Sequence, residues 1–207
     1  KAYTCHYNAD LGFSIVGYEG DGVDGHEIPH FLGKVPELSI FKKRNAVAGW
    51  IAKSSLLAFG DYLEFNGTAA IQNTANLSTI FSDTTLELAT NTSYNNSTDS
   101  YINYNFTSIP NVCKIGTYIG TGAAGNYVDC GFKAAWVLIK NLTSTQQWHM
   151  YDASRGDNKE LYANLSNAEG TTTRIDFVDD GFVCIDTSTG VNGLNDQYIF
   201  MAYAEGT

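Results

Sequence analysis

The sequence predicts an all-β fold made of two tandem antiparallel β-sandwich repeats of about 98 residues each. Three observations support this prediction. The 207 residues include 13 Tyr, 20 Gly and only 3 Pro, a composition that suits pleated strands joined by tight turns. The apolar residues fall in short alternating segments separated by turn residues. Finally, the second half of the sequence repeats the order of the first.

The repeat is marked by matching residues about 100 positions apart. The glycine-rich stretch 17–22 recurs at 117–122, and Trp50 corresponds to Trp148. Across the matched pairs the offset falls from 100 to 97. We therefore expect a strand from a preceding repeat, or a linker, over 1–12. Repeat 1 then covers 13–109 and repeat 2 covers 110–207.

The expected strands of repeat 1 are short and end at turn residues. Two Asp-Gly dipeptides within 19–25 supply the positive φ that tight turns require. The strand over 27–31 contains Pro29 and is expected at a sheet edge. Long loops are expected within 66–100, which is rich in Asn. The remaining strands are expected at 13–18, 38–42, 50–52, 61–65, 80–81, 86–88 and 101–106.

Repeat 2 presents the same order of elements. Asp179-Asp180-Gly181 is expected to form a hairpin turn, and Asn66 and Asn164 should cap equivalent turns through their own backbone. We interpret Trp50 and Trp148 as core residues, with stacking on a sugar as the alternative. The strands of this repeat are expected at 113–119, 126–130, 136–140, 148–151, 161–165, 174–178, 182–185 and 198–203.

The charge balance excludes some classes of partner. The net charge is -10, and an acidic surface repels phosphate groups, so neither nucleic acid nor an anionic membrane is expected as a partner. No apolar run of about twenty residues is present, so no membrane-spanning helix is expected. Because the sequence begins at Lys1 rather than Met, we expect a fragment or a processed product.

The four cysteines form no metal-binding or redox motif. Cys113 and Cys130 are interpreted as facing each other across a hairpin that turns at 120–125, where a disulfide would depend on register. Repeat 1 has no such pair, and free, partly buried thiols are the favoured interpretation. His149 has no evident cysteine or carboxylate partner in the sequence.

The candidate ligand-facing residues lie in two loops. Asp21 and Asp24 offer oxygen ligands of the kind that Ca²⁺ prefers, but repeat 2 lacks them and a solvated acidic turn is favoured. Arg155 and Asp157 flank Gly156 in an integrin-type tripeptide, for which an ordinary turn is the favoured alternative. Eight Asn-x-Ser/Thr sequons are interpreted as a by-product of composition.

No catalytic, cofactor-binding or metal-ligating residue is assigned from the sequence. A glycosidase would need two carboxylates across a cleft, and the acidic clusters here are better explained as turns. We therefore expect a protein that is not an enzyme and that needs no cofactor.

Segments in both halves of the sequence resemble a repeat found in virion proteins of tailed phages. These segments are 13–18, 30–38, 131–140, 148, 151–155 and 198–205. The resemblance implies a tail-fibre or particle-surface protein with jelly-roll or concanavalin-like sandwiches. It supplies no catalytic residues.

The function that this resemblance implies is attachment. We expect a tail-fibre or spike segment on the exterior of the virion, and therefore extracellular. It would present loops to a host-surface glycan or protein receptor. Its other expected partners are virion subunits, including copies of itself in a homo-oligomer. The alternative is a capsid decoration or a self-assembling surface filament with no ligand, and a carbohydrate-active enzyme is the least favoured reading.

Overall fold

The computed structural model describes residues 3–156 and 159–206, and its regular elements are β-strands with two short 3-10 turns, η1 (Ala9–Leu11) and η2 (Ala75–Leu77). The all-β prediction is confirmed, with every strand pair antiparallel. Strands β1 to β9 are Tyr3–Asn8, Phe13–Glu19, His26–Pro29, Leu38–Lys43, Trp50–Lys53, Asp61–Glu64, Gln72–Asn73, Thr79–Phe81 and Thr85–Leu88. Strands β10 to β18 are Ser100–Phe106, Cys113–Ile119, Asn126–Asp129, Ala134–Asn141, Trp148–Asp152, Leu161–Tyr162, Ile175–Val178, Gly181–Cys184 and Gln197–Ala204.

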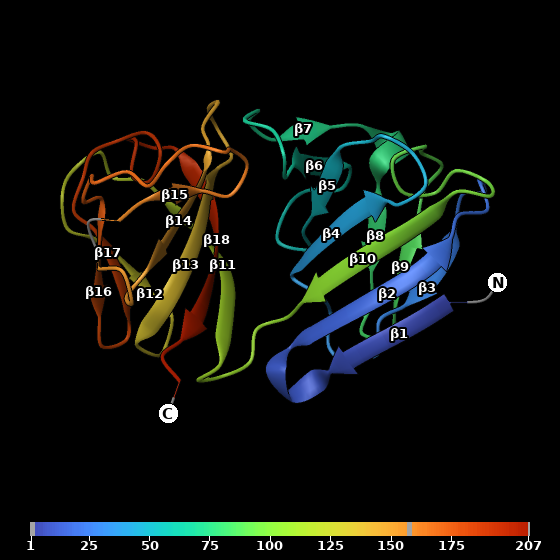
Figure 1. The fold of residues 1–207 in the computed structure, drawn as a ribbon, viewed down its shortest axis with the longest axis horizontal. Helices are drawn as coiled ribbons and strands as arrows, with labels where there is room; N and C mark the ends of the chain where they lie inside the picture. Colours follow the sequence, from blue (N-terminus) through green and yellow to red (C-terminus); the bar gives the residue numbers. More distant parts are fainter. Residues whose placement is uncertain (1–2, 157–158, 207) are drawn as a thin grey trace. The chain divides into compact units, whose positions relative to one another are not determined.

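The chain forms two compact units, and each unit contains one large and one small sheet (Figure 1). The large sheet of the first unit has the order β1-β2-β10-β4-β5-β6-β7, and its small sheet has the order β3-β9-β8. In the second unit the corresponding orders are β11-β18-β13-β14-β15 and β12-β17-β16. β1 therefore pairs with β2 of its own chain, at the outer edge of the large sheet.

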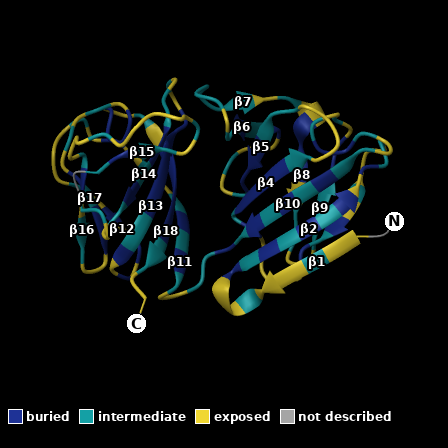
Figure 2. Cartoon of the chain, in the orientation of Figure 1, coloured by how far each residue is buried: buried dark blue, intermediate teal, exposed yellow. Residues whose placement is uncertain are grey.

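Each unit has its own apolar core between its two sheets. In the first unit the core joins Phe41 and Tyr101 of the large sheet to Leu86 and Leu88 of the small one. The alternation of buried and exposed residues that sequence patterning predicts is visible along the strands in Figure 2. The packing of both sheets around one core gives each unit the character of a β-sandwich.

Each unit contains the same set of tyrosine contacts. The Tyr18 hydroxyl donates to the carbonyl of Tyr94 at 2.6 Å, and the Tyr118 hydroxyl donates to the carbonyl of Val191 at the same distance. These tyrosines stack on Tyr101 and Tyr198, with ring centroids 5.3 and 4.8 Å apart. The residues matched by the internal repeat therefore make matching interactions.

A buried asparagine holds the glycine-rich turn in each unit. Asn95 accepts a hydrogen bond from the Asp21 N–H at 3.0 Å, and Asn192 accepts one from the Thr121 N–H at 2.8 Å. In both units the asparagine amide also donates to the carbonyl two residues further along the turn, at 2.8 Å. Asn95 is a sequon residue, and its complete burial gives it a structural role.

The two tryptophans occupy equivalent strands but not the inter-sheet core. Trp50 pairs with Lys42, and Trp148 pairs with Lys140, so both occupy the same register. Trp148 is buried, whereas Trp50 is half-buried and stacks near Tyr104. Because residues alternate across a strand, both tryptophans point away from the core between the sheets. The interpretation of Trp50 as a core residue is therefore wrong. Trp148 is buried as expected, but it lies outside the core between the sheets.

The turn and edge predictions are largely confirmed. β3 ends at Pro29 and lies at the edge of its sheet, and Asp179-Asp180 forms the turn between β16 and β17. Asn66 and Asn164 follow equivalent strands, but Asn164 accepts from the Trp148 N–H at 3.0 Å rather than from its own turn. Its predicted role is therefore wrong, because its side-chain oxygen bonds to the neighbouring strand β14 instead.

The predicted hairpin that joins Cys113 to Cys130 does not form. β11 pairs with β18 in the large sheet, while the strand before Cys130, β12, pairs with β17 in the small sheet. All four cysteines are free. The glycine-rich turn between the two strands is therefore a crossing between sheets, a geometry that turn residues alone do not distinguish from a hairpin.

One short segment departs from the order of the sequence. Asn66–Ala70 belongs to the second unit, together with Ser108–Thr207, although its neighbours in the chain belong to the first. The carbonyl of Thr68 accepts hydrogen bonds from Lys140 Nζ and from the Gln146 N–H, both at 3.0 Å. This segment covers the buried Lys140, so the second unit takes part of its structure from early in the chain.

Candidate functional site

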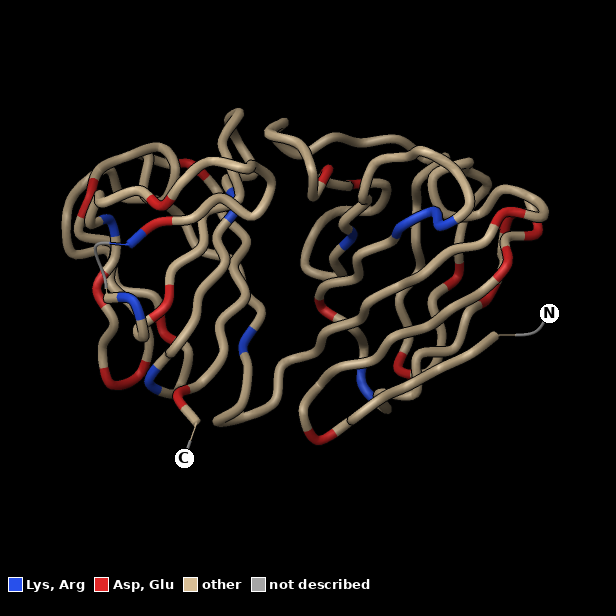
Figure 3. Tube along the Cα trace, viewed as in Figure 1, with Lys and Arg blue, Asp and Glu red and all other residues tan. Residues whose placement is uncertain are grey.

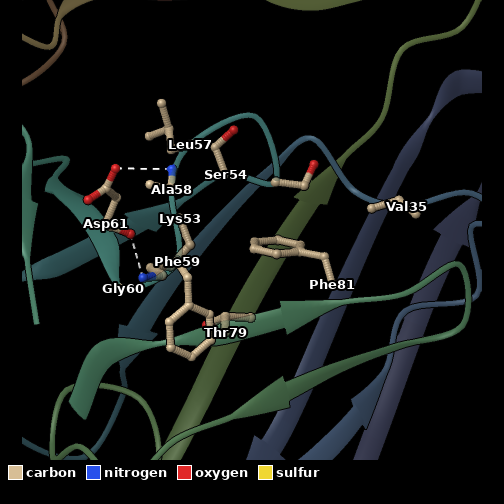
Figure 4. A pocket seen from close by; sticks show the side chains of 11 residues that line it. Val35, Lys53, Ser54, Leu57, Ala58, Phe59, Gly60, Asp61, Thr79 and Phe81 are labelled. Atoms are coloured by element: carbon tan, nitrogen blue, oxygen red, sulfur yellow. Dashed lines mark hydrogen bonds between the residues drawn. The ribbon is translucent and has the colours of Figure 1, made fainter. Parts of the chain in front are cut away.

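A cavity of about 250 Å³ lies between the sheets at one end of the first unit (Figure 4). Lys53 at the end of β5 contributes one wall, Thr79 and Phe81 of β8 contribute another, and the loop 54–60 closes the rim. We call this cavity the Lys53 pocket. Val35 and Asp61 complete its lining.

The loop at the rim is held in place by Asp61. Its carboxylate accepts hydrogen bonds from the Ala58 N–H at 3.1 Å and from the Asn73 amide at 2.8 Å. Gly60 adopts a φ of 84°, a left-handed conformation in which an L side chain would be strained. The same Asn73 amide donates to the Phe59 carbonyl at 3.0 Å. The loop therefore has a defined shape before any ligand arrives.

Lys53 brings a positive charge to the inner wall of the pocket. The side chain is buried because β5 alternates, and Lys53 shares the core-facing side of the strand with Ile51. Its ammonium donates to the Asp61 carbonyl oxygen at 2.5 Å. Burial lowers the pKa of Lys53 to about 8, and the negative charge of Asp61 opposes that shift only in part.

The remaining walls combine apolar surface with one hydroxyl. Phe59 is 66% exposed at the rim, and Phe81 is partly buried against the core. Thr79 is only 7% exposed, and its hydroxyl interacts with the buried Tyr94 hydroxyl. An apolar cleft with a few convergent polar groups is the usual form of a small-molecule site.

The second unit has an aromatic core residue at the position of Lys53. Tyr151 stands three residues after Trp148, as Lys53 stands three after Trp50, and its ring belongs to the core of its unit. The Tyr151 hydroxyl donates to Glu160 at 2.5 Å. By strand register, Tyr151 therefore stands where Lys53 stands in the first unit, and Glu160 stands where Tyr62 does.

Glu160 is the centre of a buried polar cluster in the second unit. The carboxylate is 3% exposed and lies 2.6 Å from His149 Nδ1, 3.0 Å from Arg174 Nε and 3.0 Å from the Tyr162 hydroxyl. Burial alone would raise the pKa of Glu160. The hydrogen bonds from His149 and Tyr151 and the charge of Arg174 lower it to about 2 instead.

The partners in this cluster neutralise the negative charge of Glu160 and hold its carboxylate in one orientation. Both carboxylate oxygens accept hydrogen bonds, and Arg174 is paired further with Asp186 at 2.6 Å. Sequence reasoning missed the cluster, and its statement that His149 lacks a carboxylate partner is wrong. The partners come from β14, β15 and the loop before β16, and only the strand register brings them together.

The two predicted residues of the acidic loop differ in exposure, because Asp21 is half-buried and Asp24 is exposed. Asp21 accepts a hydrogen bond from the Val23 N–H at 2.9 Å and lies 3.6 Å from His26 Nδ1. It lines a small hollow of about 170 Å³ with Tyr18 and His26. Asp24 is exposed further along the loop. Within the described ranges, no group of three or more His, Cys, Asp or Glu side chains is placed to hold a metal ion.

The predicted tripeptide lies beside an ion-pair network. Arg155 pairs with Asp152 at 2.5 Å and with Glu169 at 2.8 Å, so its guanidinium is held against its own loop. Asp157, the other predicted ligand-facing residue, lies outside the described residues. Acidic positions lie mainly in loops and near strand ends in each unit (Figure 3).

Comparison with known proteins identifies one family. The family model described as "Domain of unknown function (DUF7483)" matches residues 2–207. No curated protein and no solved structure matches the chain. In the described part of the chain, no helix has the length and apolar character needed to cross a membrane.

Proposed function

We propose that this chain, which belongs to the DUF7483 family, is a virion structural protein of a tailed phage. In this proposal it forms a tail-fibre or spike segment on the exterior of the particle and attaches to a ligand on the host surface. The resemblance of its repeated segments to phage virion proteins motivates the proposal. The ligand is a host-surface glycan or protein, and other virion subunits are the remaining partners.

The proposal includes two tandem copies of one sandwich of the jelly-roll or concanavalin-like kind. The matching tyrosine and asparagine contacts of the two units support a duplication. The equivalent register of Trp50 and Trp148 supports it as well. Duplication gives one copy freedom to change at its open end while the other retains a filled core.

A single observation favours attachment over a purely structural role. The Lys53 pocket is open in the first unit, while the residue equivalent to Lys53 in the second unit is Tyr151, which is buried in the core. A subunit with a purely structural role would gain stability if side chains closed that pocket, because buried apolar contacts stabilise a fold. An open pocket with a preformed rim is the arrangement that a ligand requires.

Imaging of the parent particle tests this proposal. Cryo-electron microscopy should show two sandwich-sized densities per copy on a tail fibre or spike, with the Lys53 pocket open to solvent. A location inside the capsid, or absence of the chain from purified particles, would overturn the proposal.

The alternative is a capsid decoration or a filament subunit without a ligand. It is favoured by β1, an edge strand whose Tyr3 and Tyr7 rings are exposed beside Phe31. An exposed edge is a ready surface for pairing between subunits. The same imaging decides between the two functions, because a decoration would cover the capsid and not the tail.

A further inference from the structure

The chain contains two Asn-Gly dipeptides, Asn66-Gly67 and Asn192-Gly193. In such a pair the backbone nitrogen of the glycine can attack the side-chain amide carbon of the asparagine, because glycine has no Cβ to hinder the approach. The attack closes a five-membered succinimide ring and releases ammonia, and water then opens the ring. The two dipeptides offer the same chemistry, so their surroundings in the fold decide which of them reacts.

The fold protects Asn192-Gly193. Asn192 is completely buried, its amide oxygen accepts from the Thr121 N–H at 2.8 Å, and its amide nitrogen donates to the Ala123 carbonyl at 2.8 Å. The Gly193 N–H, which would have to lose its proton in order to attack, donates to the Tyr198 hydroxyl at 2.7 Å. Succinimide formation here would break several hydrogen bonds inside the second unit, where an unsatisfied polar group is costly.

Asn66-Gly67 lies in the exposed turn that follows β6. Asn66 is exposed and Gly67 is half-buried. Among the described residues, no group accepts a hydrogen bond from the Gly67 N–H. The attacking nitrogen is therefore not held by a hydrogen bond within the described part of the chain, and the amide that it attacks lies where water can reach the ring and open it.

The equivalent turn of the second unit lacks this chemistry. Asn164 is the counterpart of Asn66 in the repeat, but Leu165 follows it in place of a glycine. A leucine side chain crowds the backbone nitrogen that would attack. The amide of Asn164 is also held, because its oxygen accepts from the Trp148 N–H at 3.0 Å and its nitrogen donates to Gln147 Oε1 at 2.8 Å. The reactive pair is therefore particular to the turn of the first unit.

Position 66 begins the segment that the second unit takes from early in the chain. Asn66–Ala70 belongs to the second unit, where the Gly67 carbonyl accepts from Asn164 Nδ2 at 3.3 Å and the Thr68 carbonyl accepts from the buried Lys140 Nζ at 3.0 Å. An isoaspartyl linkage carries the main chain through the side-chain carbon and so lengthens it by one methylene just before Gly67. Both carbonyls would then lose their register against these donors.

We infer that Asn66 is a deamidation site and that its isoaspartyl product weakens the packing of Asn66–Ala70 on the second unit. The Gly67 nitrogen forms a bond to the Asn66 amide carbon, the bond from that carbon to the side-chain nitrogen breaks, and the proton lost by Gly67 leaves with the ammonia. Water then adds across either ring C–N bond and gives an aspartyl or an isoaspartyl residue. The reaction consumes only water, and it is independent of the proposed attachment function.

Incubation of the full chain at mildly alkaline pH tests the reaction, because base removes the proton from the attacking nitrogen. Trypsin places Asn66, Asn164 and Asn192 on separate peptides, 54–114, 160–174 and 175–207, in which mass spectrometry locates each conversion. In the folded chain Asn66 should convert at least about tenfold faster than Asn192, a barrier difference of ~1.4 kcal/mol. In urea both Asn-Gly pairs should convert at similar rates, with Asn164 slower than either.

Two variants assign the reaction to the dipeptide. Gly67→Ala should slow conversion at least about tenfold, and alanine suits the backbone there because Gly67 is not among the glycines with positive φ in the described residues. Asn66→Gln keeps an amide but requires a six-membered ring, so it provides a test even if the alanine variant fails to fold. The control is Asn167→Gln, which changes another exposed asparagine and should leave the rate at Asn66 unchanged.

Hydrogen exchange tests the effect on the second unit. The converted chain should show reduced protection in β13 and β14, with β2 and β10 unchanged, whereas Asn66→Gln incubated in the same way should keep its protection. An Asn66 that retains its amide in the folded chain, or an Asn192 that converts equally fast there, would overturn the assignment of the site. Conversion to isoaspartate at position 66 without any loss of protection would overturn its effect on the second unit.

Discussion

At the scale of single residues, Glu160 shows how a buried charge is stabilised by partners. Glu160→Gln should lower the free energy of unfolding by about 3 kcal/mol or more, because it leaves Arg174 and His149 without their carboxylate. The control Glu169→Gln removes a partly exposed pair and should change stability by less than about 1 kcal/mol. Denaturant unfolding measures both changes, and equal effects would contradict the assigned role.

The depressed pKa of Glu160 gives this difference a pH dependence. Since the folded-state pKa is about 2 and the ordinary value is 4.5, the stabilisation is complete above about pH 4.5. It should be lost as the pH falls toward 2. The stability difference between the wild type and Glu160→Gln should therefore shrink across this window in unfolding experiments. A difference that stays constant would refute the shift.

Lys53 makes stability depend on pH in the same direction as Glu160, but at alkaline pH. Its folded-state pKa is lowered to about 8, so between about pH 8 and 10 the unfolded chain binds more protons and the folded state gains stability. The buried thiols of Cys130 and Cys184, with their pKa raised to about 12, act in the reverse direction. The measured quantity is therefore the stability of the wild type relative to Lys53→Met.

This relative stability should rise from pH 8 to 10 by up to about 1.4 kcal/mol per pH unit. Denaturant unfolding of the two proteins at matched pH values provides the measurement. The thiols contribute equally to both proteins and cancel in the difference. A relative stability that is flat over this range would show that the amine of Lys53 titrates as an exposed lysine does.

At the scale of elements, β1 determines how the chain meets its neighbours. Its edge is open on one side, and Tyr7 is 58% exposed and stacks with Phe31, with ring centroids 5.5 Å apart. We predict a homo-oligomer joined through this edge, which Tyr7→Lys should dissociate, because charge on an edge strand opposes pairing. Light scattering measures the change, with Leu194→Lys as the control. A wild-type chain that is monomeric at all concentrations would contradict the prediction.

Strand positions were predictable from the sequence, whereas strand partners were not. Alternating apolar residues mark segments such as 113–119 and 198–203, and the structure places strands there. The same alternation does not say which sheet a strand joins, and so the crossing between β11 and β12 resembles a hairpin in sequence. The His149–Glu160 pair depends on that register and was missed for the same reason. The Lys53 pocket was missed as well, because a lysine at a strand end is normally solvated.

At the scale of the whole molecule, the internal repeat predicted matching units but not the exchange of Asn66–Ala70. An internal repeat shows which residues of the two halves correspond. It does not show which unit a segment packs into, so it could not predict that Asn66–Ala70 belongs to the second unit. Asn164 Nδ2 lies 3.3 Å from the Gly67 carbonyl, and Lys140 is completely buried beneath the same segment. The second unit therefore depends on residues that precede it by about forty positions.

Removal of this segment should destabilise the second unit selectively. Deletion of residues 67–69 in the full chain takes away the Thr68 carbonyl and leaves the buried ammonium of Lys140 and the Gln146 N–H short of an acceptor. The expected loss is about 1–3 kcal/mol for such a donor. Hydrogen exchange should show reduced protection in β13 and β14, with β2 and β10 unchanged.

Two lysine variants complete the test. Lys140→Met should reduce protection in the same strands, and its combination with the deletion should be less than additive, because both changes remove one interaction. Lys42→Met alters the equivalent lysine, which bonds to Ala48 within the first unit, and should reduce protection there only. If the deletion lowered protection in β2 and β10 and spared β13 and β14, Asn66–Ala70 would have to be assigned to the first unit.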